Sequence, residues 1–284
     1  MKLIAYVFSG TGNTRRVCEA LLEEAKCHGV ESEIYAVRKG ETPPAPEGFD
    51  GVILGYPVHA FNAPAALLKF IKKMPKRKKG ERLPVWLVRS SGEPLRLNDA
   101  SGILPARRLK RRGYAVKGEF SYIMPYNIIF RHSDKMAARM WRANCNLIER
   151  DAQTLASGEG SRSRVGLLRR FVSFVLRIEH IAMPVLGKCF RANKKKCIGC
   201  GKCANVCPQG NIIMKDGKPK FGGSCVGCMG CAFSCPTDAI RTSLLNGWRV
   251  NGAYSFGGDP ASDAEVCDYC KKAYLRFFHE AEKS

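Results

Sequence analysis

Eight cysteines in the carboxyl-terminal half of the chain fall into two runs of identical spacing, C-x-x-C-x-x-C-x-x-x-C-P. The first run comprises Cys197, Cys200, Cys203 and Cys207. The second begins 28 residues later and comprises Cys225, Cys228, Cys231 and Cys235. Cysteine thiolates are the ligands of iron–sulfur clusters, and four of them hold one [4Fe–4S] cubane. The spacing therefore predicts two such clusters.

Two other uses of cysteine could also produce C-x-x-C pairs. Zinc sites space their pairs by longer loops and need no proline after the last cysteine. Disulfides need an oxidising compartment, and nothing in the sequence indicates export. We therefore favour clusters over zinc and over disulfides.

The segment that carries the cysteines is an internal repeat. Further positions match at the same offset: Ile198/Val226, Gly199/Gly227, Ala204/Ala232 and Ile212/Ile240. Over about residues 191–243 the sequence resembles the bacterial two-cluster ferredoxin domain, a small α+β fold. In that domain the fourth cysteine of each run serves the other cluster. The resemblance implies one cluster held by Cys197, Cys200, Cys203 and Cys235, and a second held by Cys225, Cys228, Cys231 and Cys207.

A second segment with chemical potential follows an apolar run at residues 3–8. It consists of small and hydroxyl-bearing residues: Ser9, Gly10, Thr11, Gly12, Asn13 and Thr14. Glycine-rich turns that lead into a helix can bind phosphate through backbone N–H groups. The segment is neither a Walker A loop nor a dinucleotide fingerprint. It resembles the phosphate loop of flavodoxins, Ser/Thr-x-Thr-Gly-x-Thr, and this resemblance implies bound flavin mononucleotide (FMN).

The elements that must position this loop alternate between strand and helix. Strands are expected at residues 3–8, 33–37, 51–55, 85–89 and 115–124, and one helix at 65–73. Such alternation indicates a parallel sheet with helices on both faces. The expected fold is α/β, a flavodoxin-like doubly wound five-stranded sheet, followed by the ferredoxin domain. Ligands of such sheets lie beyond the carboxyl ends of the strands.

The flavodoxin resemblance places two further loops beside the isoalloxazine ring. The implied ring contacts are Tyr56, Pro57, Val58, His59, Phe61, Ser91 and Gly92. Loop aromatics also serve as hydrophobic anchors, which explains Tyr56 and Phe61 equally well. A lone histidine such as His59 is more often structural than catalytic.

The length of 284 residues suggests about two domains. We expect an FMN domain at 1–157, a basic apolar linker helix at 158–190, the two-cluster domain at 191–243 and an extension at 244–284. The combination resembles the flavodoxin–ferredoxin fusions of anaerobic bacteria and archaea. Residues 8–14, 55–58 and 124–125 carry that resemblance together with the cysteine runs. The amino-terminal apolar run is too short for a signal peptide, so a cytoplasmic protein is expected.

The formal net charge is +22. Such a field attracts acidic proteins, nucleic acid or anionic membranes, and no nucleic-acid-binding motif is present. Basic runs at 77–79, 107–112 and 194–196 could steer an acidic redox protein. In the linker, one helical face would hold Leu168, Phe171, Val172, Val175, Leu176 and Ile181. We favour a helix packed on the flavin domain or the clusters over one that docks on a membrane surface or partner. The linker carries too many charges to span a bilayer.

Three functions fit these features. The favoured one is an electron-transfer protein that passes single electrons between two [4Fe–4S] clusters and FMN. The second is an FMN-dependent iron–sulfur reductase of a small acceptor, and the third is a cluster-containing sensor or binding protein. Cys267 and Cys270 could bind a metal or act in redox chemistry, but we interpret them as two thiols on a helix. Four isolated cysteines are interpreted as ordinary thiols: Cys18, Cys27, Cys145 and Cys189.

Overall fold

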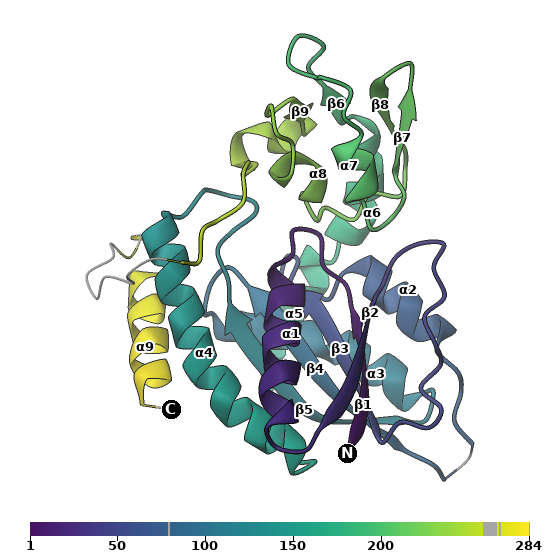
Figure 1. The fold of residues 1–284 in the computed structure, drawn as a ribbon, viewed down its shortest axis with the longest axis vertical. Coiled ribbons are helices and arrows are strands. Elements are labelled where there is room, and N and C mark those ends of the chain that lie inside the picture. The colour runs from purple at the N-terminus through teal and green to yellow at the C-terminus, as the bar shows by residue number, and fades with distance from the viewer. Residues whose placement is uncertain (79, 258–265, 267, 284) are drawn as a thin grey trace.

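The computed structural model describes residues 1–78, 80–257, 266 and 268–283. An α/β body formed by the amino-terminal half carries a smaller domain at one end of its sheet (Figure 1). The smaller domain contains both cysteine runs. The chain then returns from this domain to the body.

The body is built on a parallel sheet of five strands in the order β2-β1-β3-β4-β5. The strands are β1 (Lys2–Val7), β2 (Glu31–Ala36), β3 (Gly51–Pro57), β4 (Leu83–Ser91) and β5 (Tyr114–Ile123). β1, β3 and β4 are nearly continuous apolar runs, because both faces of the sheet are covered. The predicted five-stranded doubly wound fold is confirmed.

Helices cover both faces of the sheet and create two separate cores. On one face, α1 (Asn13–Lys26) and α4 (Asp134–Ala156) pack against the sheet, and α9 (Lys271–Glu282) packs against α4. On the other face lie α2 (Ala65–Lys73) and α3 (Ile103–Lys110), which follows the 3₁₀ helix η1 (Arg96–Gly102). Successive strand residues alternate between the two cores, as the pleat of a strand requires.

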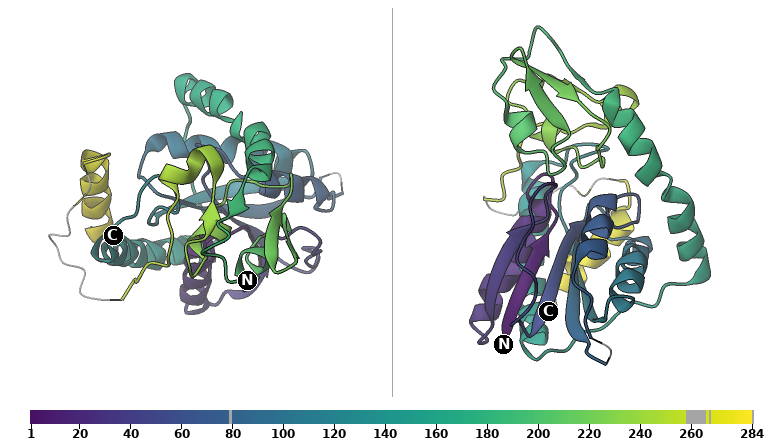
Figure 2. Two further views of the ribbon diagram at one scale, coloured as in Figure 1. Left: turned by 90° about the horizontal axis from the view of Figure 1, so that it is seen from above. Right: turned by 90° about the vertical axis from the view of Figure 1, so that its right-hand side faces the viewer.

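The linker forms two helices rather than the single one expected, α5 (Leu167–Leu176) and α6 (Glu179–Lys188). They run along the outside of the molecule from the body to the smaller domain (Figure 2). The apolar face that the sequence predicts as a packing surface is instead exposed in large part. Leu168, Phe171 and Ile181 keep 76%, 63% and 74% of their area accessible. The linker does pack on the body, as predicted, but polar groups rather than this apolar face attach it there.

The smaller domain is α+β, as predicted. Two short antiparallel pairs join β6 (Arg191–Ala192) to β9 (Ile240–Arg241), and β7 (Ile212–Lys215) to β8 (Lys218–Phe221). The helices α7 (Lys202–Asn205) and α8 (Gly230–Phe233) lie at equivalent positions of the internal repeat. The 3₁₀ helix η2 (Ser243–Trp248) follows, and residues 249–257 lead back toward α4.

Within the part of the chain that the structure describes, no helix combines the length and apolar character needed to cross a membrane.

Candidate functional site

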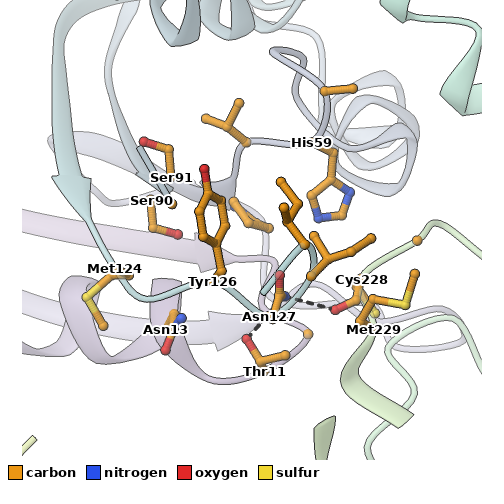
Figure 3. A pocket seen from close by; sticks show the side chains of 18 of the residues that line it. Thr11, Asn13, His59, Ser90, Ser91, Met124, Tyr126, Asn127, Cys228 and Met229 are labelled. Carbon is orange, nitrogen blue, oxygen red and sulfur yellow. Dashed lines mark hydrogen bonds between the residues drawn. The ribbon is translucent and has the colours of Figure 1, made fainter. Parts of the chain in front are cut away.

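A cavity of about 460 Å³ lies at the carboxyl edge of the sheet, between the body and the smaller domain. This volume is within the usual range for small-molecule sites. The loops that follow β1, β3, β4 and β5 form its walls, and the second cysteine run closes one side (Figure 3). The fold thus brings together loops that are far apart in the sequence.

The predicted phosphate loop forms one end of this cavity, at the amino terminus of α1. Ser9, Gly10, Thr11, Asn13 and Thr14 all line it. The amino terminus of a helix offers free backbone N–H groups and favours an anion. The first turn of α1 holds no acidic residue that would compete with that anion. These features fit a phosphate group.

Local hydrogen bonds fix the shape of the loop. Gly12 has φ 95° and caps α1, a conformation that glycine adopts without strain. Its N–H donates to the Ser9 hydroxyl at 3.2 Å. Thr14 shares a 2.7 Å hydrogen bond with Ser90 of β4, and the Asn13 amide donates to the Pro125 carbonyl at 2.9 Å. Gly12 therefore sets the conformation of the turn, although it does not itself line the cavity.

Most of the predicted ring contacts also reach the cavity. Its lining includes Pro57 at the end of β3, and Val58, His59 and Phe61 from the loop after it. Ser91 at the end of β4 and Gly92 from the loop after it line the cavity as well. These loops leave adjacent strands of the sheet, which explains why they meet at one edge.

Tyr56 is the exception, and the prediction that it contacts the ring is corrected. It lies within β3, and its side chain is fully buried in the core on the α2–α3 side of the sheet. The sequence places it in a loop because the strand was expected to end at residue 55. The strand continues to Pro57, so Tyr56 takes a core position instead.

Several residues of the cavity were not predicted from the sequence. The loop after β5 contributes Tyr126 and Asn127. The Tyr126 ring lies so close to Gly92 that a Cβ there would come within 2.0 Å of it, and its hydroxyl donates to Glu93. The expected strand at 115–124 already pointed to this loop, since it opens on the same edge as the others. Residues from outside the sheet also line the cavity, such as Met183 and Trp248, and no motif in the sequence indicates that they do.

Two titratable groups face each other in the cavity wall. His59 Nδ1 lies 3.6 Å from Glu179 Oε1, which comes from the linker helix α6. Burial lowers the pKa of the His59 imidazole to about 4 and raises the pKa of the Glu179 carboxyl to about 7. At neutral pH the imidazole is therefore uncharged, while Glu179 can hold or release a proton.

The eight cysteines of the two runs gather around two further small cavities. Cys197, Cys200, Cys203 and Cys235 line one of them. Cys207, Cys225, Cys228 and Cys231 line the other. Each set takes three thiols from one run and the fourth from the other run, which is the arrangement that crossed ligation requires. Each set could hold a cubane.

Backbone amides support the fourth cysteine of each run in the same way. Asn211 N–H donates to Cys207 Sγ at 3.3 Å, and Ala239 N–H donates to Cys235 Sγ at 3.2 Å. Hydrogen bonds to sulfur stabilise negative charge on a ligand and tune a cluster's potential. Among the described residues, no three His, Cys, Asp or Glu side chains are placed to hold a single metal ion. The thiols of each set line a cavity instead of converging on a single metal position.

The remaining cysteines lie apart from these sets. Cys18 is buried in the core, and Cys27, Cys145 and Cys189 are exposed. Cys270 precedes α9 and packs against the core of the body. Cys267 lies outside the described residues, and so does Lys79 of the basic run at 77–79.

The phosphate loop and the second cysteine run are in direct contact. Cys228 lines both the large cavity and the second thiol cavity. A Cβ on Gly10 would lie 2.6 Å from Cys228 Cβ, and one on Gly230 would lie 2.4 Å from the Gly10 carbonyl oxygen. Asn127 donates to the Cys228 carbonyl at 3.1 Å and reaches Thr11 (Figure 3). Glycines on both sides thus allow two backbones to meet with no side chain between them.

Two family models match separate parts of the chain. A model of the flavodoxin domain matches residues 3–94, and a model of the 4Fe-4S dicluster domain matches residues 196–240. No curated protein matches the chain significantly.

Among solved structures, similar ones include an archaeal flavodoxin, with 14% identity, a TM-score of 0.41 and coverage of 56% of this chain and 98% of that chain. Flavodoxin 1 from Bacillus cereus has 17% identity, a TM-score of 0.38 and coverage of 55% and 95%. The NAD(P)H:quinone oxidoreductase from Methanothermobacter marburgensis has 16% identity, a TM-score of 0.38 and coverage of 55% and 96%. At these scores the likeness supports no inference about function.

Proposed function

Because this chain is a flavodoxin–ferredoxin fusion, we propose that it passes single electrons between two [4Fe–4S] clusters and a bound FMN. A redox role follows from the two domain types themselves. The observation that carries the finer proposal is the position of Cys228, which belongs to the walls of both the large cavity and one thiol cavity. A cluster held there would be a direct neighbour of a flavin held in the large cavity.

When bound, FMN would supply a centre that exchanges one or two electrons, and each cubane would supply a centre that exchanges one. The chain's own contribution is to hold these centres in fixed positions. The α1 amino terminus would bind the flavin phosphate, and the loops after β3 and β4 would border the ring. Gly10 and Gly230 would let the second thiol set approach the flavin site without intervening side chains.

The exposure of the thiols suggests the order of transfer. Cys200 of the first set is exposed, whereas Cys228 of the second faces the interior wall of the large cavity. Lys194, Lys195 and Lys196 are exposed beside the first set. We propose that an acidic redox protein exchanges electrons at the first cluster, and that the second cluster relays them to or from FMN.

A reductase of a small acceptor is the second candidate function, and one observation favours it. Reduction of most organic acceptors needs protons as well as electrons. Glu179, with a pKa raised to about 7 by burial, could hold a proton at the cavity wall. Turnover of a small acceptor by the isolated protein, with a low-potential electron donor, would favour this candidate over a carrier.

The proposal is tested by anaerobic purification followed by quantitation of iron, sulfide and flavin. Two cubanes and one flavin predict about eight irons, about eight sulfides and one FMN per chain. Brief reduction of the clusters should then be followed by reduction of the flavin in the same molecule. Intact clusters without any flavin would contradict both the carrier and the reductase, and would favour a sensor or binding protein.

A further inference from the structure

The linker helices α5 and α6 present a continuous row of large apolar side chains to solvent. We call this row the linker ridge. Its members each have more than half of their area exposed: Leu167, Leu168, Phe171, Phe174, Val175, Ile178, Ile181 and Val185. Intervals of three and four residues keep them on one side of the helices. Monomeric proteins seldom expose contiguous apolar surfaces of this kind unless the surface binds something.

The opposite side of α5 is attached to the body by polar groups. Ser173 is buried, and its hydroxyl donates to Asn62 Oδ1 at 3.0 Å. The Asn62 amide donates in return to the Ser173 carbonyl at 2.9 Å. In α6, His180 Nε2 lies 3.1 Å from the Ala63 carbonyl oxygen. An ordinary surface helix buries its apolar side and exposes its polar side, so this helix has the reverse orientation.

These attachments prevent the ridge from turning inward. Rotation of α5 would break paired hydrogen bonds that are buried at Ser173 and Asn62, and buried polar groups without partners are costly. The apolar side is therefore held outward by the fold itself. Figure 2 shows both helices on the periphery, and the side chains of the ridge are exposed along its length.

The charges of the linker segment itself are almost all positive, and two of them, Arg162 and Arg169, pair with Glu119 and Asp99 of the body. Residues 160–191 contain seven basic residues, Arg162, Arg164, Arg169, Arg170, Arg177, Lys188 and Arg191, and one acidic residue, Glu179. Glu179 is turned toward the large cavity rather than toward solvent. Burial lowers the pKa of Arg108 on α3, and the charge of the nearby Arg177 lowers it further. Arg164, Arg170 and Lys188 are exposed.

We propose that the linker ridge binds the surface of an anionic membrane. Its apolar side chains would enter the boundary between headgroups and acyl chains, and the flanking basic side chains would meet lipid phosphates. A helix with a large apolar face, a basic polar face and few acidic groups has the composition of an interfacial membrane helix. Basic residues beside such a helix add attraction to acidic lipids.

The charge and the shape of the ridge argue against two other occupants. A second copy of the chain would bring another net charge of +22 and another basic rim to the contact, so the two copies would repel each other. A protein partner would need a groove that accepts a row of projecting side chains. A lipid interface is fluid and adapts to such a row without a preformed groove.

Co-flotation with vesicles tests the proposal on the anaerobically purified holoprotein. Vesicles of phosphatidylcholine with phosphatidylglycerol should carry the protein upward, and phosphatidylcholine alone should do so weakly. High salt should reduce binding, because it screens the attraction between charges. Failure of the wild-type protein to float with either vesicle would overturn the proposal.

Matched variants distinguish membrane binding through the ridge from non-specific binding through any exposed apolar side chain. The triple variant Leu168→Ser, Phe171→Ser, Phe174→Ser should lose at least about tenfold in vesicle partitioning, since burial of each side chain is worth more than a twofold change. Ile213→Ser is the control, because Ile213 on β7 is 70% exposed but lies outside the ridge. Arg170→Ser should weaken binding to anionic vesicles more than Lys220→Ser on β8 does. Equal partitioning of ridge and control variants would refute the proposal.

A gain-of-signal variant and a size measurement complete the test. Phe171→Trp should show a blue-shifted emission on addition of anionic vesicles, because the indole would leave water. Light scattering on the wild type and on the triple variant reports self-association. A wild-type dimer that becomes monomeric in the triple variant would assign the ridge to an interface between copies instead, and would overturn the membrane proposal.

Discussion

Cys228 is the residue at which the two halves of the molecule meet. Its side chain belongs to the second thiol set, its carbonyl accepts a hydrogen bond from Asn127, and its Cβ faces Gly10 of the phosphate loop. Small residues on both sides make this contact possible. A larger side chain at Gly10 would have to displace the side chain of Cys228, and one at Gly230 would have to displace the backbone of Gly10.

At this scale the crossed thiol sets make a first prediction. Cys207 lies in the first run but lines the cavity of the second set. Cys207→Ala should therefore remove the cluster beside the flavin site, leave about half of the iron, and abolish rapid transfer from cluster to flavin. Iron analysis and stopped-flow absorbance measure the two effects.

Cys203→Ala provides the comparison, since Cys203 lines the cavity of the other set. It should also lose about half of the iron, but the cluster that remains should still reduce the flavin. Cys27→Ala, at an exposed isolated thiol, should change neither quantity. Ligation within each run would place Cys203 and Cys207 on the same cluster, so rapid transfer that survives in both variants would contradict the crossed sets.

The close approach at Gly10 makes a second prediction. A Cβ there would lie 2.6 Å from Cys228 Cβ and 3.0 Å from its carbonyl oxygen. Gly10→Ala should lower the free energy of unfolding by about 1–3 kcal/mol, as overpacking does, and should slow transfer between cluster and flavin. Denaturant titration checks the stability. Gly247→Ala, whose Cβ would meet nothing within 4 Å, should have little effect, and equal stability of the two variants would contradict the prediction.

Among the elements, the segment between β5 and α4 joins the sheet to the carboxyl-terminal part of the chain. His132 in this segment is only 5% exposed and stacks on Tyr126 at 5.3 Å between ring centroids. Its backbone N–H donates to the Tyr254 hydroxyl at 3.2 Å. Tyr126 in turn lines the large cavity, so the packing of this segment supports the cavity wall.

Burial lowers the pKa of His132 to about 4, from an ordinary value of 6.5. The unfolded chain therefore binds a proton more readily than the folded one between these two values. The corresponding stability is complete above about pH 6.5 and is lost as the pH falls toward 4. His132→Phe keeps a ring at this position and removes the titration.

The free energy of unfolding of His132→Phe, measured relative to that of wild type, should therefore be higher at pH 5 than at pH 7.5 by about 1–2 kcal/mol. Denaturant midpoints at the two pH values, measured without oxygen, provide the comparison. The same substitution at His28, which is exposed, is the control. A difference between variant and wild type that does not change with pH would rule out His132 as a source of acid sensitivity.

For the whole molecule, the extension after residue 243 links the domains and returns to the body. Arg131 donates to the carbonyls of Gly252 and Ala253, and the Tyr254 hydroxyl donates to the Tyr126 carbonyl at 2.7 Å. The Tyr274 hydroxyl of α9 donates to the carbonyl of Gly92, a residue of the cavity wall. The tail, expected from sequence as a separate extension, thus fastens the smaller domain and supports the large cavity.

This fixed arrangement predicts that transfer between cluster and flavin occurs within one molecule. After rapid partial reduction of the clusters, the rate of flavin reduction should not change over a tenfold range of protein concentration. The two sites share Cys228 in their walls, so no encounter between molecules is needed. Stopped-flow absorbance provides the measurement, and a rate proportional to concentration would contradict transfer within one molecule.

The sequence by itself determined the features that depend on local spacing. The residue types and intervals in the cysteine runs predict cluster chemistry, and Ser9–Thr14 predicts a phosphate loop. Both are predictable because each motif is formed by residues that are close together in the sequence. Alternating apolar runs predict the five strands, since burial on both faces leaves a direct mark on composition. The resemblance to flavodoxins, rather than local composition, assigned Pro57, His59, Ser91 and Gly92 to the cavity edge.

Only the tertiary structure decided what depends on contacts between distant segments. It assigns Tyr56 to the core, because β3 continues to Pro57 and the alternation of side chains along the strand directs Tyr56 into the core rather than the cavity. It sets Cys228 against Gly10, although 218 residues separate them in the sequence. It turns the apolar side of the linker outward, because hydrogen bonds at Ser173 and His180 hold the polar side inward. Periodicity shows that a helix has two faces, but the partners of each face are set by the rest of the fold.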